Sequence, residues 1–398
     1  MRSIELFAGA GGLAIGTSLA GFRHAAVLEW DKNACATLQK NASKWNVIPG
    51  DVRDYSFSKH QDDVKFVSGG PPCQPFSLGG KHGGHEDKRN MFPEAVRAVR
   101  ELRPVAFLFE NVKGLLRKNF SNYYSYIIQQ LRLPDVLPRG DEEWIDHHSR
   151  LERYHTSGRD SSLKYNVVFQ MLNAANYGVP QRRERVLIVG IRSDVGVEFS
   201  FPAPTHSEDA LLYDKWVSGD YWEEHSISKR TRPKMPKTIS GRVDRLRCLT
   251  KEMLGLRWRT VRDAIRDLPE AKLGETVTSV NNHYLIPGAR SYFGHTGSPL
   301  DEPAKALKAG DHGVPGGENT LRMEDGTVRY FTVRECARIQ TFPDDWTLEG
   351  SWTESMRQLG NAVPVQLAFC VARRLRTVLV KHAGRSRREL LLSQPLTT

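Results

Sequence analysis

The sequence predicts an α/β protein with a Rossmann-like sheet and a second, smaller, loop-rich domain. Short apolar runs alternate with amphipathic stretches up to about residue 200, which is typical of βα units. A glycine-rich turn, Gly9 to Gly12, follows the first apolar run. From about Phe201 to Arg329 this rhythm disappears, and Pro, Gly, His and basic residues dominate. We therefore expect a first domain over residues 1–200, a second over 201–329, a segment over 330–380 that returns to the first domain, and a basic tail over 381–398.

Composition narrows the class of protein. Charged residues make up 26% of the 398 residues and no run of eighteen apolar residues occurs, so we expect no transmembrane helix. A strand-like run begins almost directly after Met1 and leaves no room for a secretory signal, so we expect residence in the cytoplasm. The five cysteines are widely spaced without a Cys-x-x-Cys pair, so neither a disulfide framework nor a metal site is predicted. His147 and His148 lack a third ligand at a suitable spacing, and we expect both at the surface.

The charge of the chain favours a polyanionic partner. The formal net charge is +11 and the pI is near 9.4. Between Lys229 and Arg262, twelve Lys or Arg residues stand against two acids. A solvated face and a nucleic-acid surface both produce such a block, and the sequence leaves that choice open.

The first three βα units favour a nucleoside-containing cofactor. Gly9 and Gly11 fit a turn in which bare backbone approaches a nucleotide-like ligand, although an ordinary glycine-rich turn has the same pattern. The second strand ends in Glu29, about twenty residues further on, where a carboxylate can accept hydrogen bonds from ribose hydroxyls. The third strand ends near Asp51. Each unit therefore places a suitable group at the same sheet edge.

Two candidate catalytic residues follow later strands. Cys73 lies within the proline-rich stretch Gly70 to Ser77, whose restricted φ angles present the thiol at a fixed position after a strand. A buried structural cysteine is the alternative. Glu110 ends the apolar strand over residues 105–109 at the same edge. Since a buried acid is unfavourable unless it is paired or used, Glu110 is either structural or an active-site acid of raised pKa, and the shared edge favours the second.

Arginines and a long polar stretch complete the candidate site. Arg183 and Arg185 alternate at the start of the strand Val186–Gly190, so both can project into the cleft, but surface salt bridges explain them equally well. The stretch Gly79–Asn90 is either a loop that closes over a substrate or a plain connection.

Six motifs, in this order, resemble those of one enzyme family. They are Glu5–Gly12 (ELFAGAGG), Pro71–Ser77 (PPCQPFS), Glu110–Val112 (ENV), Gln181–Arg185 (QRRER), Arg334–Arg338 (RECAR) and Gly360–Pro364 (GNAVP). On these motifs the chain resembles the DNA (cytosine-5)-methyltransferases of the bacterial restriction-modification or orphan type. The resemblance implies an S-adenosylmethionine-dependent methyltransferase sheet, a target-recognition domain before Arg334, and methyl transfer to C5 of a flipped cytosine in a specific double-stranded DNA sequence.

The residue chemistry agrees with that reaction. Cytosine C5 is a poor nucleophile because it belongs to an aromatic ring, and addition of the Cys73 thiolate to C6 makes C5 an enamine carbon. Glu110, kept protonated by burial, can hydrogen-bond N3 and the exocyclic amine. By resemblance, Arg183 and Arg185 hold the flipped base and stabilise negative charge.

The resemblance also assigns binding residues. For S-adenosylmethionine, which leaves as S-adenosylhomocysteine, it implies Phe7, Gly9, Gly11, Gly12, Leu13, Glu29, Trp30, Asp51, Val52, Pro72, Met91, Asn361 and Ala362, with Met91 replacing the usual leucine. For DNA we expect Gln74, Ser77, Gln181, Lys234, Lys308, His312, Gly316 and Gly317, with sequence reading in Lys308–Asn319 and mainly phosphate contacts in Lys229–Arg262.

Partners and rivals follow from the same reading. We expect double-stranded DNA as substrate, no membrane, a monomer associated with the nucleoid, and a cognate restriction endonuclease as a candidate partner. Rivals are a tRNA cytosine-5 methyltransferase, a catalytically silent DNA-binding regulator on this fold, and a pyridine-dinucleotide oxidoreductase, which leaves Cys73 unexplained. The recognition region of more than a hundred residues, with Ser77 after the cysteine motif, favours DNA over tRNA.

Outside the motifs we expect few elements. Between residues 117 and 163 the pattern predicts one helix, Tyr124–Leu131, and little else. The segment from about Asp135 to Ser162 is longer than in the smallest family members and has no assigned role. A helix is expected from Val365 to about Val380, followed by a frayed tail.

Overall fold

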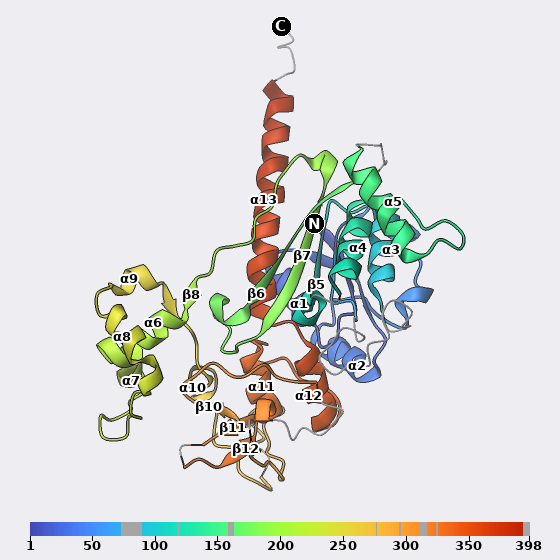
Figure 1. Cartoon of the computed structure of the whole chain (residues 1–398). Coiled ribbons are helices and arrows are strands. Elements are labelled where there is room, and N and C mark those ends of the chain that lie inside the picture. The colour runs from blue at the N-terminus through green and yellow to red at the C-terminus, as the bar shows by residue number, and fades with distance from the viewer. Residues whose placement is uncertain are drawn as a thin grey trace. The chain divides into compact units, whose positions relative to one another are not determined.

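The chain forms two compact units in the computed structural model (Figure 1). Unit 1 consists of Met1–Leu172, Glu184–Pro202 and Ala368–Thr398, and unit 2 consists of Asn173–Arg183 and Ala203–Leu367. The structure describes residues 1–72, 90–117, 120–157, 163–275, 277–293, 296–309, 317–323 and 325–392, with side chains up to residue 382.

Unit 1 contains a mixed seven-stranded sheet. Its strand order is β3-β2-β1-β4-β5-β7-β6. β1 pairs in parallel with β2 and β4, β2 with β3, and β4 with β5, whereas β7 runs antiparallel to β5. The predicted α/β fold is confirmed. The strands are β1 (Arg2–Leu6), β2 (Arg23–Glu29), β3 (Val47–Pro49), β4 (Val64–Gly69), β5 (Ala106–Val112), β6 (Tyr165–Asn173) and β7 (Glu184–Arg192).

Helices pack against this sheet through apolar stripes. In α3 the buried Val96, Val99 and Leu102 recur at helical spacing, while the arginines between them stay partly exposed. The helices are α1 (Gly12–Leu19), α2 (Lys32–Asn41), α3 (Phe92–Leu102), α4 (Ser121–Arg132), α5 (Trp144–Thr156) and α13 (Val365–Leu392). α13 continues beyond its predicted end near Val380, so the prediction of a tail frayed from Lys381 is wrong for residues up to Leu392. None of the helices in the described part of the chain is long and apolar enough to cross a membrane.

Helix α5 was missed by the sequence prediction. It packs on α4, and Figure 1 shows the two helices side by side. His147 lies fully buried between them, with Nδ1 2.8 Å from the Tyr126 hydroxyl and Nε2 2.8 Å from the Val136 carbonyl. The expected surface position of His147 is therefore wrong, because both ring nitrogens find hydrogen-bond partners inside the protein.

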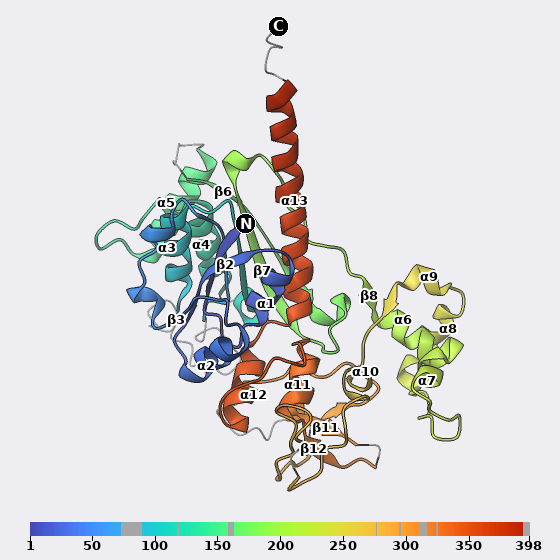
Figure 2. The same cartoon turned by 180° about the vertical axis from the view of Figure 1, so that it is seen from behind.

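Unit 2 is more helical than its turn-rich sequence predicts. A small core of Leu211, Tyr221, Trp222 and Trp258 lies among the first helices of unit 2. Figure 2 shows the helices α6, α7, α8 and α9 as one group. Residues 330–367 group with this unit and not with the sheet, because α11 packs on α10 and α12. The elements are β8 (His206–Ser207), α6 (Glu208–Tyr213), α7 (Asp220–Glu224), α8 (Ser240–Leu246), α9 (Lys251–Leu254), β9 (Leu256–Arg257), α10 (Val261–Ile265), β10 (Ser298–Pro299), β11 (Thr320–Arg322), β12 (Val328–Tyr330), α11 (Val333–Ile339) and α12 (Trp352–Asn361).

A neutral acid lies inside the sheet of unit 1. Glu5 on β1 is fully buried and accepts a hydrogen bond from the Ser68 hydroxyl on β4. Burial raises the pKa of Glu5 to about 8, against the opposing effect of that hydrogen bond. The folded chain therefore keeps this proton at pH 7, whereas the unfolded chain loses it above about pH 4.5.

We expect Glu5→Gln to stabilise the protein at high pH. Because the folded pKa lies above the unfolded pKa, the free energy of unfolding falls by roughly 1.4 kcal/mol per pH unit between the two values. The amide cannot ionise, so the variant should melt several degrees above the parent at pH 8 and close to it at pH 5. Thermal unfolding at both pH values checks this, with the exposed Glu198→Gln as control. An equal shift at pH 5 and pH 8 would contradict the assignment.

Candidate active site

The glycine turn after β1 exposes backbone at the carboxyl edge of the sheet. Phe7, Gly9 and Gly11 have φ angles of 55°, 54° and 92°, so three residues adopt left-handed conformations within five positions. Gly11 then caps α1. Glycine adopts such angles without strain, whereas Phe7 does so only because its surroundings hold it, and residues of that kind cluster at functional sites.

Glu29 ties this turn to the end of β2. Its Oε2 accepts a hydrogen bond from the Gly9 amide at 2.7 Å, and Oε1 accepts from the amides of Trp30 and Asp31 at 2.9 and 2.8 Å. Glu29 is 7% exposed, and burial raises the pKa of its carboxyl while hydrogen bonds from the three amides oppose that shift. A carboxylate has further lone pairs, so Glu29 can still accept hydrogen bonds from a ribose beside the turn.

The other predicted cofactor residues of unit 1 follow neighbouring strand ends. Trp30 is 75% exposed directly after β2, which leaves its ring available to a planar ligand. The Asp51 carboxylate pairs with Arg53, which lowers the pKa of Asp51. The Pro72 carbonyl accepts from the Met91 amide at 3.1 Å. In unit 1 the structure therefore places Phe7, Gly9, Gly11, Gly12, Leu13, Glu29, Trp30, Asp51, Val52, Pro72 and Met91 after the carboxyl ends of β1, β2, β3 and β4.

Glu110 and Arg185 meet where β5 ends and β7 begins. Arg185 Nε lies 2.6 Å from Glu110 Oε1, and the two side chains are only 13% and 9% exposed. Burial lowers the pKa of Arg185, and the Glu110 charge opposes that shift. The sequence left open whether Glu110 is a paired structural acid or an active-site acid. The structure supplies a guanidinium, which satisfies the requirement that a buried charge be paired.

Asn111 holds the segment that leads to Cys73, a role that sequence reasoning missed. Its side-chain amide donates to the Pro71 carbonyl at 2.9 Å, and its Oδ1 accepts from the Val112 amide at 2.9 Å. The signal was a second polar residue directly after Glu110 in a buried strand. Several predicted site residues lie outside the described residues; they are Cys73, Gln74, Ser77, His312 and Gly316.

Arg183 belongs to unit 2 and contacts main chain there. Nη1 donates to the Leu307 carbonyl at 2.8 Å, and Nη2 donates to the carbonyls of Gly360 and Ala362 at 2.5 and 3.0 Å. The side chain is 1% exposed. Unit 2 also contains the remaining predicted residues, which are Gln181, Lys234, Lys308, Gly317, Asn361 and Ala362. Their predicted roles stay predictions.

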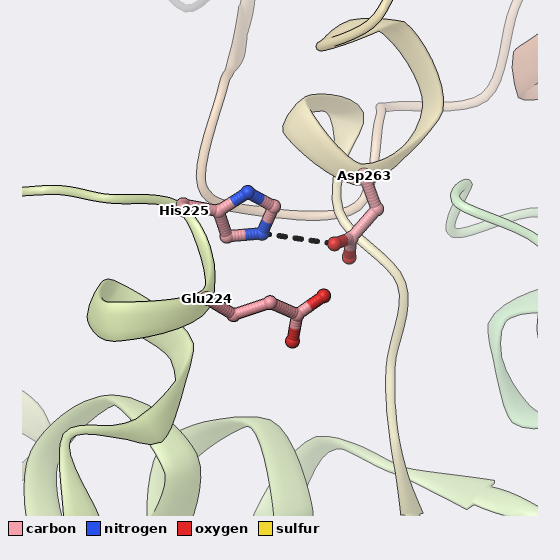
Figure 3. Close-up of side chains that lie close together, drawn as sticks. All are labelled: Glu224, His225 and Asp263. Atoms are coloured by element: carbon pink, nitrogen blue, oxygen red, sulfur yellow. Dashed lines mark ion pairs between the residues drawn. The ribbon is translucent and has the colours of Figure 1, made fainter.

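A cluster of possible metal ligands in unit 2 is already neutralised. Figure 3 shows Glu224, His225 and Asp263 close together, with His225 Nε2 2.9 Å from an Asp263 oxygen. Arg257 donates to both Asp263 oxygens, at 2.6 and 2.9 Å, and to Glu224 at 2.9 Å. Because a guanidinium occupies the carboxylates, we propose no metal at this cluster.

We expect Arg185→Met to lower the stability of unit 1 by roughly 3 kcal/mol, because it leaves Glu110 buried and unpaired. The exposed pair Lys113–Glu184 joins the same strand ends at 2.7 Å and provides a matched control. Lys113→Met should change stability by less than about 1 kcal/mol. Thermal unfolding of both variants measures the difference, and equal losses would show that the Glu110 pair has no special stabilising role.

Comparison with known proteins assigns the family. The sequence model of the family described as C-5 cytosine-specific DNA methylase matches residues 1–133 and 157–377. The intervening gap covers α5, which is thus an addition to the common core. The Type II methyltransferase M.Eco47II of Escherichia coli is 32% identical over 386 residues, covering 93% of this chain and 77% of that protein. The Type II methyltransferase M.NgoMIV of Neisseria gonorrhoeae is 31% identical over 384 residues, covering 96% and 98%.

Solved structures support the fold. A DNA modification methyltransferase encoded within an E. coli prophage aligns with a TM-score of 0.57 at 21% identity, over 96% of this chain and 99% of that one. The S. pombe Dnmt2 methyltransferase aligns with a TM-score of 0.55 at 18% identity, again over 96% and 99%. The family predicted from the six motifs is confirmed: this chain belongs to the C-5 cytosine-specific DNA methylase family and is a methyltransferase that acts on cytosine in DNA.

Proposed function

We propose that the chain transfers the methyl group of S-adenosylmethionine to C5 of a flipped cytosine within a specific double-stranded DNA sequence. The observation that carries this proposal is the Glu110–Arg185 pair, which lies at the sheet edge where Asn111 anchors the segment that precedes Cys73. An acid and a fixed cation at the edge that the chain reaches just before its cysteine motif fit an addition reaction on a pyrimidine ring. Base extrusion is required because a stacked base is inaccessible to this chemistry.

The residues present fit the cofactor. The turn at Gly9 offers backbone beside Glu29, and Trp30 presents an exposed ring next to it. We propose that Glu29 takes the ribose hydroxyls, that Trp30, Asp51 and Val52 border the adenine, and that the remaining predicted residues line the amino-acid side. Bound S-adenosylmethionine supplies a methyl group made electrophilic by the positive charge on its sulfur.

The protein side of the reaction divides among three side chains. The Cys73 thiolate adds to C6 and forms a carbon–sulfur bond, which makes C5 nucleophilic. After C5 has taken the methyl group, loss of the C5 proton to water breaks the carbon–sulfur bond, expels the thiolate and restores the aromatic ring. Glu110 faces N3 and the exocyclic amine: its carboxylate accepts a hydrogen bond from the amine, and a proton that it takes up from solvent passes to N3 as negative charge develops. Arg185 fixes Glu110 through their ion pair and stabilises that charge.

The enzymatic proposal predicts activity that depends on Cys73. Plasmid DNA incubated with S-adenosylmethionine should acquire 5-methylcytosine at one recurring sequence, detected by bisulfite sequencing. Cys73→Ala should abolish the reaction, and Glu110→Gln should lower kcat by roughly 10²- to 10⁴-fold because it removes the proton donor. DNA containing 5-fluorocytosine should remain covalently joined to the parent enzyme through residue 73.

Controls separate this function from its rivals. Glu198→Gln, at an exposed position of unit 1, should retain full activity. Methylation of tRNA in place of duplex DNA would support the tRNA enzyme, and DNA binding without methyl transfer would support the silent regulator. Activity that survives Cys73→Ala would refute the covalent mechanism.

The proposed partners follow from the same assignment. Relatives named Type II methyltransferases support a place in a restriction-modification system, so we propose a cognate endonuclease that recognises the same sequence. We propose that the chain acts as a monomer. The DNA substrate supports residence in the cytoplasm with the nucleoid.

The basic block of unit 2 contains cations that are held by acids and cations that are not. Arg242 pairs with Glu208 and Asp209, Lys251 with Asp214 and Asp220, and Arg262 with Asp301; these ion pairs hold the helices together. Between α7 and α8 the exposed cations have no carboxylate partner among the described residues; they are Lys229, Arg230, Lys234 and Lys237. We therefore propose that the loop between α7 and α8, and not the whole block, contacts DNA phosphates.

We expect Lys234→Ala to weaken binding to all DNA sequences alike. Loss of one phosphate contact should reduce the slope of log Kd against log salt by about one unit. Lys251→Ala is the matched control, because that cation is held by Asp214 and Asp220 and should leave the slope unchanged. Fluorescence anisotropy across a salt series measures both. A loss confined to the cognate sequence would refute the phosphate role.

A further inference from the structure

A close contact between two backbone segments lies inside unit 2. Gly360 is near the end of α12, and a Cβ atom placed on it would lie 2.2 Å from the Ala309 nitrogen and 2.4 Å from the Lys308 carbonyl carbon. No side chain larger than hydrogen fits there, since Cβ contacts this short do not occur in proteins. The main chain at Lys308–Ala309 therefore packs directly on the turn at Gly360.

Arg183 binds both sides of this contact. Its guanidinium donates to the Leu307 carbonyl on one segment and to the Gly360 and Ala362 carbonyls on the other. Three carbonyl dipoles around a side chain that is 1% exposed compensate the loss of water around its charge. The planar guanidinium fixes the directions of these bonds, which a flexible ammonium group cannot do.

Asn319 closes the other end of the segment that begins at Lys308. Its Oδ1 accepts from the Lys308 amide and its Nδ2 donates to the Lys308 carbonyl, both at 3.0 Å, and the residue is 2% exposed. The Leu307 amide donates to the Gln181 side chain at 3.0 Å. Two buried side chains, Arg183 and Asn319, thus fix one point of the main chain against the Gly360 turn.

We propose that Arg183 is a positioning residue that couples DNA recognition to cofactor binding, and that it does not contact the flipped base. The inference rests on the proposed function, in which Lys308 begins the DNA-reading segment and Asn361 with Ala362 borders the cofactor. A displacement of Leu307–Ala309 or of Gly360–Ala362 must strain the Arg183 hydrogen bonds that join them, so a ligand that fixes the main chain on one side favours the bound arrangement on the other.

Unit 2 offers a matched control for this role. Arg334 is also fully buried, and its guanidinium donates to three carbonyls, those of Asn281, Pro343 and Trp346, at 3.0, 3.1 and 2.8 Å. None of these carbonyls belongs to residues 307–309 or 360–362. Arg334→Lys should therefore lower the stability of the protein to a similar degree, but it should leave the hydrogen bonds between residues 307–309 and 360–362 unchanged.

The test measures the affinity of the parent, Arg183→Lys and Arg334→Lys for S-adenosylhomocysteine by calorimetry, with and without a duplex that contains the site mapped by bisulfite sequencing. In the parent and in Arg334→Lys the duplex should tighten cofactor-product binding about fivefold or more. In Arg183→Lys the same ratio should fall below about twofold, whatever the affinity measured without DNA. Asn319→Ala removes the two hydrogen bonds to Lys308 and should lower the ratio in the same way. This variant replaces Arg183→Lys in the test if Arg183→Lys does not fold.

Three outcomes would overturn the proposal. They are a ratio near one in the parent, a ratio in Arg183→Lys or Asn319→Ala equal to that of the parent, and an equal loss in Arg183→Lys and Arg334→Lys. The proposed function fails separately, since it requires the parent enzyme to methylate DNA at all.

Discussion

The reversal of one strand organises the candidate active site. Strands β1 to β5 run parallel and end at one edge of the sheet, so their last residues gather there. β7 is antiparallel to β5 and therefore begins at that edge. Arg185, at the start of β7, pairs across from Val112 on β5 and reaches the Glu110 carboxylate. A fully parallel arrangement would put the start of that strand at the opposite edge, and Glu110 would have no cation.

Unit 1 accommodates three buried acids in three different ways. Glu5 stays neutral, because its surroundings offer only a hydroxyl and its pKa rises to about 8. Glu29 is surrounded by three backbone amides from the glycine turn and the residues after β2. Glu110 is paired with a guanidinium. The carboxyl groups of Glu29 and Glu110 lie at the sheet edge, where a ligand can contact them. Glu5 lies further from that edge on β1 and contributes only to the packing of the sheet.

Local pattern was sufficient to predict most of the sheet and the glycine turn. Apolar runs, a glycine-rich turn and an acid about twenty residues later are all visible within one short stretch of the sequence. The structure places Glu29 against Gly9, as that pattern indicates. Helix α5 could not be predicted in this way. Its packing depends on the buried His147, whose partners Tyr126 and Val136 lie outside the helix.

Two of the three arginines of the QRRER motif, Arg183 and Arg185, show more clearly what the sequence alone cannot predict. Alternation along a strand predicted that Arg183 and Arg185 would project together, but their partners come from residues 75 to 179 positions away in the sequence. Arg185 meets an acid of the sheet, whereas Arg183 meets carbonyls of unit 2. Identical side chains two residues apart therefore stand in different environments, and only the tertiary fold distinguishes them.

Tertiary contacts also decide which of the basic residues can attract DNA, so the net charge of a stretch of sequence does not locate a DNA-binding surface. Twelve cations against two acids suggest a continuous basic face, yet acids from elsewhere in the sequence, such as Asp209, Asp214 and Asp301, neutralise much of its second half. A cation held by two carboxylates contributes little to the field that attracts phosphates, because the net charge of that group is zero or negative. The field at the loop between α7 and α8 is therefore set by the cations that tertiary structure leaves without acids, and the net charge of the chain alone does not locate such a surface.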